Sequence, residues 1–420
     1  MNILWLKTEL LHPVDKGGKI RTYQMLKELK RRHHVTYLTL DDGTAGPSAR
    51  EQAAEYCHEL ICIPHRTRAK FSAGFYAELA FNLISPLPYF MRKYVSARMR
   101  EAIVEHVRHS HVDVLVCDFL NPSINLPPDA GCATLLFQHN VEALIWQRHY
   151  EVQANPLKRA YLRGQWRKTL AYERETCHRF DQVVAVSAED REIMQREYGV
   201  AEVADVPTGV DTEYFRPQGR GTYPPHRLVF TGSMDWLPNE DGIRYFTGEI
   251  LPRIKQVVPD VTLTVVGRNP FPGLVELGRR DPSITVTGRV DDVRPHMESA
   301  AAYVAPLRIG GGTRLKVYEA MAMELPLIST TVGAEGLPVR DGMELLLADT
   351  PEAFAAAVVR VLTDETFARE LGARAAAMVR GSCGWDHVAV RFAEICDRAM
   401  RLRERRRPKL ETEKALSAVG

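Results

Sequence analysis

The chain has 420 residues, more than one hydrophobic core usually supports, so two domains of about 200 residues each are expected. Hydrophobic residues make up 45% and charged residues 26%, as in soluble globular proteins, and a net charge of +2 argues against nucleic acid as the main partner. The seven cysteines are scattered without a CxxC pair, which favours reduced thiols in a cytoplasmic protein over a disulfide framework or a zinc site.

The N-terminal part alternates strand and helix patterns from its first residues. Charged Lys7 and Glu9 come too early for a signal peptide, and no run approaches the roughly 18 apolar residues of a membrane-spanning helix. The predicted elements are strand Asn2–Leu6, a loop with Gly17 and Gly18, helix Ile20–Arg31, strands Val35–Leu40, Leu60–Ile63, Val112–Cys117, Ala133–Gln138 and Gln182–Val186, and a helical region at Val141–Phe180. This order is typical of βαβ units in a parallel sheet.

A segment rich in proline and glycine, Val206–Arg227, interrupts the alternation and is expected to link two domains. A second alternation follows it, with strands predicted at Leu228–Thr231, Val261–Val266, Ile284–Gly288, Ala302–Pro306, Leu327–Thr330 and Leu345–Leu347, and helices at Glu240–Val257, Pro272–Arg280, Val293–Ala300, Arg314–Met323, Pro351–Leu362, Glu365–Val379 and Trp385–Arg403. The charged end of the chain lacks a hydrophobic period.

The predicted organisation has four parts. Residues 1–206 and 207–384 are expected to form two Rossmann-like domains, residues 385–403 a helix that could pack back on the first domain, and residues 404–420 a disordered tail. A ligand is then expected at the carboxyl ends of the strands, in a cleft between the domains.

The stretch APLRIGGGTRLKVYEAMAMELPLISTTVGAEG, from Ala305 to Gly336, carries the strongest local signal. Gly310, Gly311 and Gly312 leave no Cβ atom between the backbone and a ligand. Thr313 is a suitable N-cap for the helix that follows.

The start of that helix is basic. Its bare amides and dipole, together with Arg314 and Lys316, suit a phosphate or pyrophosphate group. Glu319 lies further along the helix, where a carboxylate can accept hydrogen bonds from sugar or ribose hydroxyls. The pattern therefore favours a nucleotide site over a purely structural turn.

Motifs along nearly the whole chain resemble the family 4 glycosyltransferases, and most closely the exosortase-associated and exopolysaccharide sugar transferases. The matching stretches, besides the one above, are HPVDKGGKIRTYQML, QHNVEALIWQRHYE, FDQVVAVSAEDR, VPTGVDTEYFRP, VFTGSMDWLPNEDG, LTVVGRNP and VTGRVDDVRPHM. The resemblance implies the α/β GT-B fold, in which two Rossmann-like domains face each other across a cleft.

The resemblance also implies a division of labour. The C-terminal domain would bind a nucleotide sugar, such as a UDP- or GDP-sugar, and the N-terminal domain would bind a saccharide or lipid-linked acceptor. Glu319 matches the glutamate that holds the ribose hydroxyls. Arg314 and Lys316 are our candidates for neutralising the diphosphate, because charge-assisted bonds to phosphate are strong.

Other positions acquire roles only through this resemblance. Gly17 and Gly18 match a loop whose backbone amides approach the sugar diphosphate, and Gly232 follows the first strand of the donor domain. Val290 lies where relatives contact the base through the backbone. His139 matches a histidine at the cleft floor that could bind the donor sugar or orient the acceptor hydroxyl.

Two features of the family pattern are missing. Many members carry a glutamate seven residues before the ribose-binding one, and Gly311 stands at that place. Either the amides of the glycine loop or Glu335 could replace it. Many members also have an arginine and a lysine after the first strand of the donor domain, where this chain offers only Asp235 and Asn239.

The resemblance implies retention of configuration at the anomeric carbon. No clear nucleophile for a double displacement is evident, although Glu335 remains open, so front-face substitution with the leaving diphosphate taking the acceptor proton fits better. No Asp-x-Asp pair is available to hold a metal-bound diphosphate, so we expect no metal and no cofactor beyond the donor itself.

Residues 66–100 combine basic side chains with the apolar run FSAGFYAELAFNLISPLPYFM. The mixture suits either docking on anionic lipid at the inner face of the cytoplasmic membrane or an ordinary buried helix.

Besides the leading interpretation of the chain as a sugar transferase for surface polysaccharide, two alternative functions stay open. One is a catalytically inactive sugar-binding subunit, and the other a nucleotide-sugar epimerase.

Overall fold

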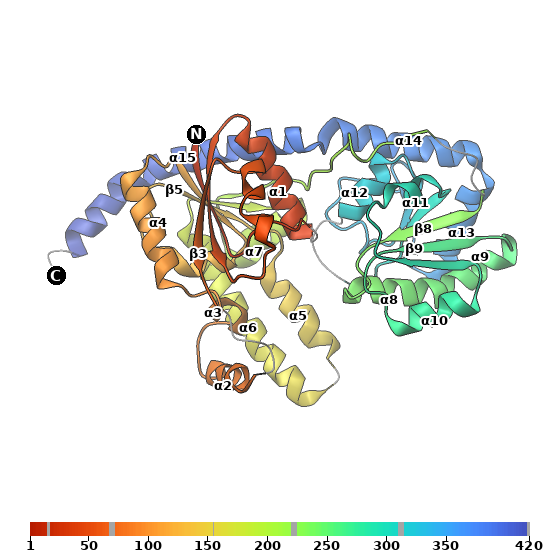
Figure 1. The fold of residues 1–420 in the computed structure, drawn as a ribbon, viewed down its shortest axis with the longest axis horizontal. Coiled ribbons are helices and arrows are strands. Elements are labelled where there is room, and N and C mark those ends of the chain that lie inside the picture. Colours follow the sequence, from red (N-terminus) through yellow and green to blue (C-terminus); the bar gives the residue numbers. More distant parts are fainter. Residues whose placement is uncertain (15–16, 67–71, 154, 220–224, 310–314, 418–420) are drawn as a thin grey trace. The chain divides into compact units, whose positions relative to one another are not determined.

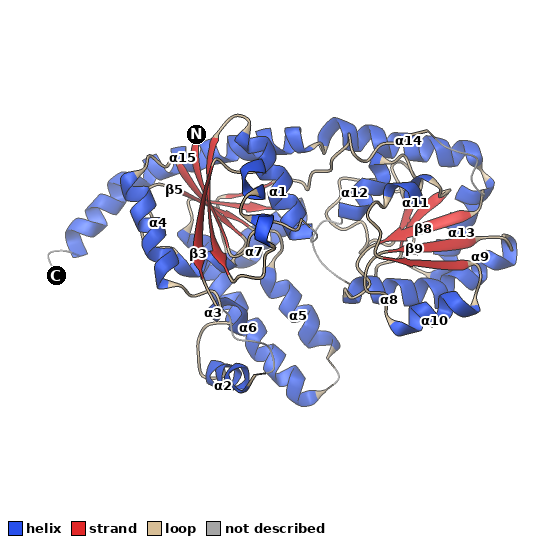
Figure 2. Cartoon of the chain, viewed as in Figure 1, coloured by secondary structure: helices blue, strands red, loops and turns tan. Residues whose placement is uncertain are grey.

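The computed structural model describes residues 1–14, 17–66, 72–153, 155–219, 225–309 and 315–417. The chain divides into two compact units, the first formed by Met1–Val206 with Val388–Gly420 and the second by Pro207–His387 (Figure 1). In each unit a parallel sheet lies between layers of helices, as Figure 2 shows. The two-domain α/β architecture expected from the alternating strands and helices is confirmed.

The sheet of the first unit has seven parallel strands in the order β3-β2-β1-β4-β5-β6-β7. They are β1 (Asn2–Lys7), β2 (His34–Asp41), β3 (Glu59–Pro64), β4 (Val114–Asp118), β5 (Ala133–Phe137), β6 (Gln182–Ala185) and β7 (Val203–Asp205). Most of β1, β2, β4, β5 and β6 is buried, because helices cover both faces of the sheet. The strand order reverses between β1 and β4, the place where such sheets bind ligands.

The main helices of the first unit are α1 (Gly17–Lys30), α2 (Ala73–Asn82), α3 (Tyr89–Arg92), α4 (Ala97–His109), α5 (Glu142–Val152), α6 (Pro156–Arg179) and α7 (Ala188–Tyr198). The helical region predicted at Val141–Phe180 is therefore two helices. Asn155 starts the second one, because its side chain accepts hydrogen bonds from the amides of Leu157 and Lys158 and Pro156 follows at the first helical position. The rings of Tyr150 and Trp166 stack between α5 and α6, and the two helices lie side by side (Figure 1).

The second unit repeats the pattern with six parallel strands in the order β10-β9-β8-β11-β12-β13. They are β8 (Arg227–Thr231), β9 (Thr262–Val266), β10 (Ile284–Gly288), β11 (Ala302–Ala305), β12 (Leu327–Ser329) and β13 (Leu346–Leu347). Its helices are α8 (Leu237–Tyr245), α9 (Leu251–Val257), α10 (Pro272–Arg280), α11 (Arg294–Glu298), α12 (Leu315–Ala322), α13 (Pro351–Thr363) and α14 (Glu365–Ser382), with a π-helical turn at Phe246–Ile250 between α8 and α9. The strand order reverses between β8 and β11.

The last helix, α15 (Trp385–Ser417), contradicts the prediction of a disordered tail after residue 403. It is rich in arginine, glutamate, lysine and alanine, which favour helix, and extending an existing helix avoids the cost of nucleation. From Val388 onward the helix belongs to the first unit, where Phe392 packs against Trp5 and Phe137. Arg398 forms an ion pair with Glu202 nearby.

Candidate functional site

At the strand-order reversal of the second unit, the chain leaves β8 through Gly232. Its φ of +153° is one that residues with a Cβ atom rarely adopt. A Cβ atom here would lie 2.7 Å from Nδ2 of Asn239 and 3.3 Å from Nζ of Lys316. The glycine thus lets two polar side chains from other elements reach the carboxyl end of β8.

Lys316 brings a positive charge to this point from α12. Its Nζ donates a hydrogen bond to Oδ1 of Asn239 at 2.5 Å and lies 4.1 Å from the centroid of the Phe230 ring. Asn239 is itself held, because its Nδ2 donates to the Ser233 carbonyl at 2.8 Å. A cation fixed at the reversal point of a parallel sheet is suited to an anionic group.

Glu319 follows Lys316 by three residues on the same helix. Desolvation raises the pKa of its carboxyl group to about 7, and the nearby charge of Lys316 opposes the shift. A carboxyl group with such a pKa can change protonation near neutral pH, when a ligand brings hydrogen-bond donors to it.

The loops after β8 and β9 form a polar cluster that sequence reasoning missed. Nε of Arg268 donates to Oγ of Ser233 at 2.9 Å, and Nδ2 of Asn269 donates to Oδ2 of Asp235 at 2.9 Å. Hydrogen bonds from the side chain of Ser233, and to a smaller extent from that of Asn269, hold the pKa of Asp235 below its usual range. Asn269 also has a positive φ of +54°. The sequence signal was present, since Arg268 comes two residues after the predicted strand Val261–Val266.

The structure describes only some of the other residues that were predicted to bind the nucleotide-sugar donor. Gly310, Gly311, Gly312, Thr313 and Arg314 lie outside the described residues. Val290 follows β10, and its partly buried side chain packs against the hydrophobic core of the second unit. Glu335 lies partly buried in the turn after β12.

The first unit has its own polar centre at the reversal between β1 and β4, built around Asp118. Oδ2 of Asp118 accepts hydrogen bonds from Nε1 of Trp5 at 3.0 Å, Nζ of Lys7 at 2.7 Å and Oγ1 of Thr22 at 2.6 Å. All four side chains are buried. Although desolvation works in the opposite direction, the charge of Lys7 and side-chain interactions with His139 and Lys7 hold the pKa of Asp118 well below its usual range.

His139, two residues after β5, lies on the other oxygen of this carboxylate. Its Nε2 is 2.7 Å from Oδ1 of Asp118, and its ring stacks on Phe119 with 3.8 Å between centroids. Burial lowers the pKa of His139 to about 3, although Asp118 opposes the shift. The imidazole is therefore neutral at physiological pH.

The Phe119 ring gives a second reason why position 18 is a glycine. Phe119 has a φ of +71°, a strained conformation for an aromatic residue, and a Cβ atom on Gly18 would lie 2.9 Å from Cζ of its ring. Gly17 and Gly18 form the start of α1. Gly18 thus makes room for the Phe119 ring, whatever its amide binds.

Glu173 on α6 fixes the segment that carries His139. Its carboxylate accepts hydrogen bonds from Nε2 of Gln138, from the amides of Glu142 and Ala143 and from the hydroxyl of Tyr198, at 2.8–2.9 Å. Desolvation nevertheless raises its pKa to about 7. Glu173 was missed because a mid-helix glutamate carries no sequence signal of its own.

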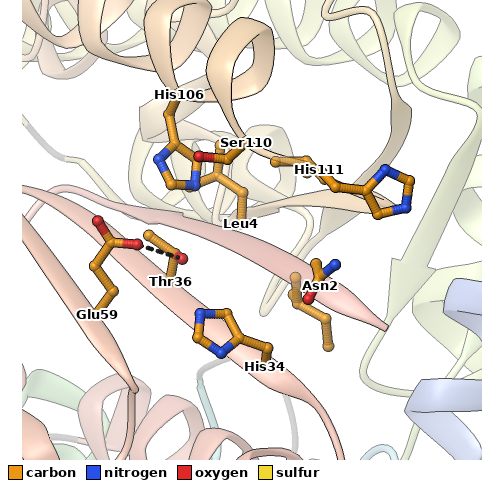
Figure 3. Close-up of a pocket in the computed structure, with 10 residues that line it drawn as sticks. Asn2, Leu4, His34, Thr36, Glu59, His106, Ser110 and His111 are labelled. Atoms are coloured by element: carbon orange, nitrogen blue, oxygen red, sulfur yellow. Dashed lines mark hydrogen bonds between the residues drawn. The ribbon is translucent and has the colours of Figure 1, made fainter.

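A separate pocket of about 270 Å³ opens at the amino ends of β1 and β2, where Figure 3 shows His106, Ser110 and His111 near Thr36 and Glu59. Oγ1 of Thr36 donates to Oε2 of Glu59 at 3.1 Å. This is the end of the sheet opposite to Lys7 and Asp118, so we do not assign it to the candidate site.

Two negative findings concern only the part of the chain that the structure describes. Its histidine, cysteine, aspartate and glutamate side chains form no group of three or more arranged to hold a metal ion. None of its helices is both long and apolar enough to cross a membrane.

Comparison with known protein families gives two matches that together span most of the chain. The family model described as Glycosyltransferase Family 4 matches residues 16–214, and the model described as Glycosyl transferases group 1 matches residues 225–364. A Klebsiella pneumoniae protein described as an uncharacterized 44.6 kDa protein in the cps region is 24% identical over 140 residues. That match covers 31% of this chain and only 36% of the relative's length.

Solved structures share the fold at low sequence identity. Sucrose-phosphate synthase from Thermosynechococcus elongatus is 18% identical with a TM-score of 0.67, covering 95% of this chain and 99% of that one. Anabaena HepE, solved in complex with UDP, is 13% identical with a TM-score of 0.65, covering 94% and 99%. TarM is 10% identical with a TM-score of 0.68, covering 94% and 99%. The fold of this chain is therefore the GT-B fold.

Proposed function

This chain belongs to the family 4 glycosyltransferases, and we propose that it transfers a sugar from a nucleotide-sugar donor to a saccharide or lipid-linked acceptor in the synthesis of a surface polysaccharide. The observation that carries the proposal is the placement of Lys316 and Glu319 on one helix at the strand-order reversal of the second unit. It provides one cation for a diphosphate and one carboxylate for ribose hydroxyls.

The nucleotide is a UDP-sugar in this proposal, with a GDP-sugar as the alternative. HepE has been solved with UDP and with UDP-glucose, and Staphylococcus aureus TarM with UDP. Lys316 and Arg268 would neutralise the diphosphate, in place of the arginine and lysine that many relatives carry after the first strand of this domain. Gly232 would allow the diphosphate to approach the backbone.

The proposed chemistry is front-face substitution with retention of configuration. The bond between the anomeric carbon and the diphosphate oxygen breaks, a bond from the acceptor oxygen to that carbon forms on the same face, and the diphosphate takes the acceptor proton. The protein contributes positioning and stabilisation of the growing negative charge. Because Lys316 and Arg268 supply positive charge, we propose that transfer needs no metal ion.

The acceptor is proposed to bind the first unit, and the relative from a cps region supports a role in surface polysaccharide. Part of this unit has the character of a membrane-docking surface. Phe81, Leu83 and Ile84 at the end of α2 are 55%, 62% and 81% exposed, and the guanidinium of Arg92 lies over the Phe81 ring. Exposed apolar side chains beside basic ones suit an anionic lipid surface and a lipid-linked acceptor.

Binding and product analysis test the proposal. UDP-, GDP- and ADP-sugars are compared by thermal shift, because a ligand that binds the folded state raises its melting temperature. Transfer to saccharide acceptors is then followed with the preferred donor, and the anomeric configuration of the product is read by NMR with and without a chelator. No stabilisation by any nucleotide sugar, or an inverted product, would contradict the proposal; release of free nucleotide with an epimerised sugar would favour the epimerase.

A further inference from the structure

A basic groove lies in the first unit, where α15 runs beside the edge of the sheet. β7 is the last strand of the sheet order, and its residues Val203, Ala204 and Asp205 line a pocket of about 360 Å³ together with side chains of α15. A second pocket, of about 260 Å³, is lined mainly by later turns of the same helix and shares Arg398 and Arg401 with the first. We call the two pockets together the arginine groove.

Five arginines line the groove. They are Arg191 of α7 and four residues of α15, Arg391, Arg398, Arg401 and Arg405. From Arg391 to Arg405 the helix advances by about 21 Å, because each residue of an α-helix adds about 1.5 Å. The planar guanidinium group pairs with carboxylates and phosphates through two parallel hydrogen bonds. An elongated molecule with several acidic groups therefore fits the groove better than a single small anion.

Three of these arginines are oriented by carboxylates at the edge of the sheet. Oδ2 of Asp205 accepts a hydrogen bond from Nη2 of Arg391 at 2.9 Å, and its Oδ1 accepts one from Nη1 of Arg191. Oε2 of Glu202 accepts a hydrogen bond from Nη2 of Arg398 at 2.7 Å. These ion pairs position the three side chains and balance part of their charge.

Arg401 and Arg405 are exposed and form no ion pair with any residue that the structure describes. They are four positions apart, so they lie on the same face of α15. Glu394 is the third carboxylate that lines the groove, and it too is exposed and has no ion pair within the described part of the chain. Five arginines against three carboxylates leave the groove with a surplus of two positive charges.

The other residues that line the groove are apolar: Val203, Ala204, Ile395 and Leu402. No described residue of the groove is aromatic, so the bases of a single-stranded nucleic acid would have no ring to stack on. A lipid bilayer is flat and does not fill a pocket beside a sheet edge. A saccharide chain, in contrast, offers C–H groups on its ring faces to the apolar residues, and it offers carboxylates to the arginines where its sugars are uronic acids.

We propose that the arginine groove binds a segment of an acidic saccharide chain, with carboxylates of the sugars on Arg401 and Arg405. The sugar rings pack their C–H faces on Ile395 and Leu402. The inference rests on the proposed function only where it identifies this chain as the acceptor or its elongated product. A chain that is held in the groove as well as at its reacting end stays bound longer, because the second contact is intramolecular.

Calorimetric titration with a galacturonate oligosaccharide tests the binding directly, and a maltooligosaccharide of equal length is the neutral comparison. Arg401→Gln with Arg405→Gln should raise Kd for the acidic probe about tenfold, because two charged contacts are lost. Arg163→Gln with Arg167→Gln is the matched control, since these exposed arginines are also four positions apart, on α6 of the same unit. No binding of the acidic probe, equal binding of both oligosaccharides, or equal Kd values in the two double variants would overturn the proposal.

A gain of affinity provides a second test, which a damaged fold cannot imitate. Glu394→Gln removes a negative charge from the groove, so it should lower Kd for the acidic probe about two- to fivefold. Glu175→Gln, exposed on α6, should leave this Kd unchanged. The same Kd in both variants contradicts the proposal. An oligouridylate of equal charge that binds as tightly as the galacturonate probe would show that the groove responds to charge alone, and would overturn the assignment to a saccharide.

Measurements of sugar transfer separate this proposal from the proposed function. With an acidic acceptor, Arg401→Gln with Arg405→Gln should raise KM for the acceptor about tenfold, while kcat and KM for the donor stay unchanged. If this double variant transfers sugar with the same KM as the unmodified protein, the role of the groove is overturned while glycosyl transfer stands. If the groove binds the acidic probe but the protein transfers no sugar, the groove stands and the proposed function is removed.

Discussion

Nζ of Lys316 on α12 donates a hydrogen bond of 2.5 Å to Oδ1 of Asn239 on α8, although the two residues are 77 positions apart in the sequence. The contact fixes a cation beside Gly232, at the point where the sheet of the second unit reverses its strand order. This chain lacks the lysine that many relatives carry after the first strand of this domain, and Lys316 on the later helix α12 supplies an ammonium group there instead.

Lys316→Met should weaken the binding of UDP by about 10- to 100-fold, the equivalent of about 1.5–3 kcal/mol for a hydrogen bond to a charged group. Titration calorimetry measures the loss. Arg369→Met is the matched control, because Arg369 is an exposed cation on α14, and it should bind UDP as the unmodified protein does. Equal affinities in all three proteins would remove Lys316 from the diphosphate site.

The raised pKa of the Glu319 carboxyl group predicts that UDP binding depends on pH. Its carboxyl pKa is raised to about 7, so below that pH the free protein carries a neutral carboxylic acid. Ribose hydroxyls donate to the ionised form, and binding must then release a proton. Affinity should fall toward about tenfold per pH unit below pH 7, because one pKa unit corresponds to about 1.4 kcal/mol.

Glu319→Gln separates this effect from the titration of the ligand's own phosphates. The variant should bind UDP more weakly at about pH 8, since the ribose contact is lost, and should show a flatter pH profile than the unmodified protein over the range of about pH 5–8. The same steep profile in both proteins would mean that Glu319 does not hold the ribose.

Gly232→Ala should be destabilising as well as harmful to UDP binding. The new Cβ atom would lie 2.7 Å from Nδ2 of Asn239 at a φ that alanine rarely adopts, a strain of about 1–3 kcal/mol. Gly248→Ala is the control, because no atom lies within 4 Å of its added Cβ and its φ is not positive. Chemical denaturation compares the two, and a Gly232 variant as stable as the Gly248 variant would contradict the prediction.

Glu173→Gln should lower the free energy of unfolding by about 1–3 kcal/mol, because an amide NH2 group in place of either oxygen would face two of the four donors that Glu173 now satisfies. Urea denaturation measures the effect. Glu175→Gln on the same helix is exposed and should change stability by no more than about 0.5 kcal/mol. A small effect of both substitutions would show that the network around Gln138 does not depend on the carboxylate.

The apolar surface at the end of α2 predicts binding to lipid. The unmodified protein should float with vesicles containing phosphatidylglycerol, and less with vesicles of phosphatidylcholine alone. Phe81→Ser with Ile84→Ser should reduce flotation, since each buried apolar side chain contributes about 1.5–3 kcal/mol. Val257→Ser is the control, because Val257 is 63% exposed but belongs to the second unit. If the protein stays at the bottom of the gradient in the presence of anionic vesicles, the proposed binding to lipid is contradicted.

Much of the fold follows from local sequence patterns. Buried strands appear as short apolar runs, and Ile284–Gly288 and Pro272–Arg280 have the bounds expected from the sequence. Those patterns are local because strand and helix periods repeat over a few residues. The prediction of a disordered tail was wrong for a related reason. Composition alone does not show that α15 packs against other elements near its start and continues as a helix from there.

The sequence by itself determined the alternation of strands and helices, the two Rossmann-like domains and the choice of Glu319 and Lys316 as site candidates. Only the tertiary structure decided that Lys7 meets Asp118 across 111 positions and that His139 lies on the opposite oxygen of the same carboxylate. The physical reason is the order of the strands: β1 lies beside β4, and β4 beside β5, so the ends of distant segments come together at one edge of the sheet. No local pattern specifies that pairing, because it is set by which strands bury each other.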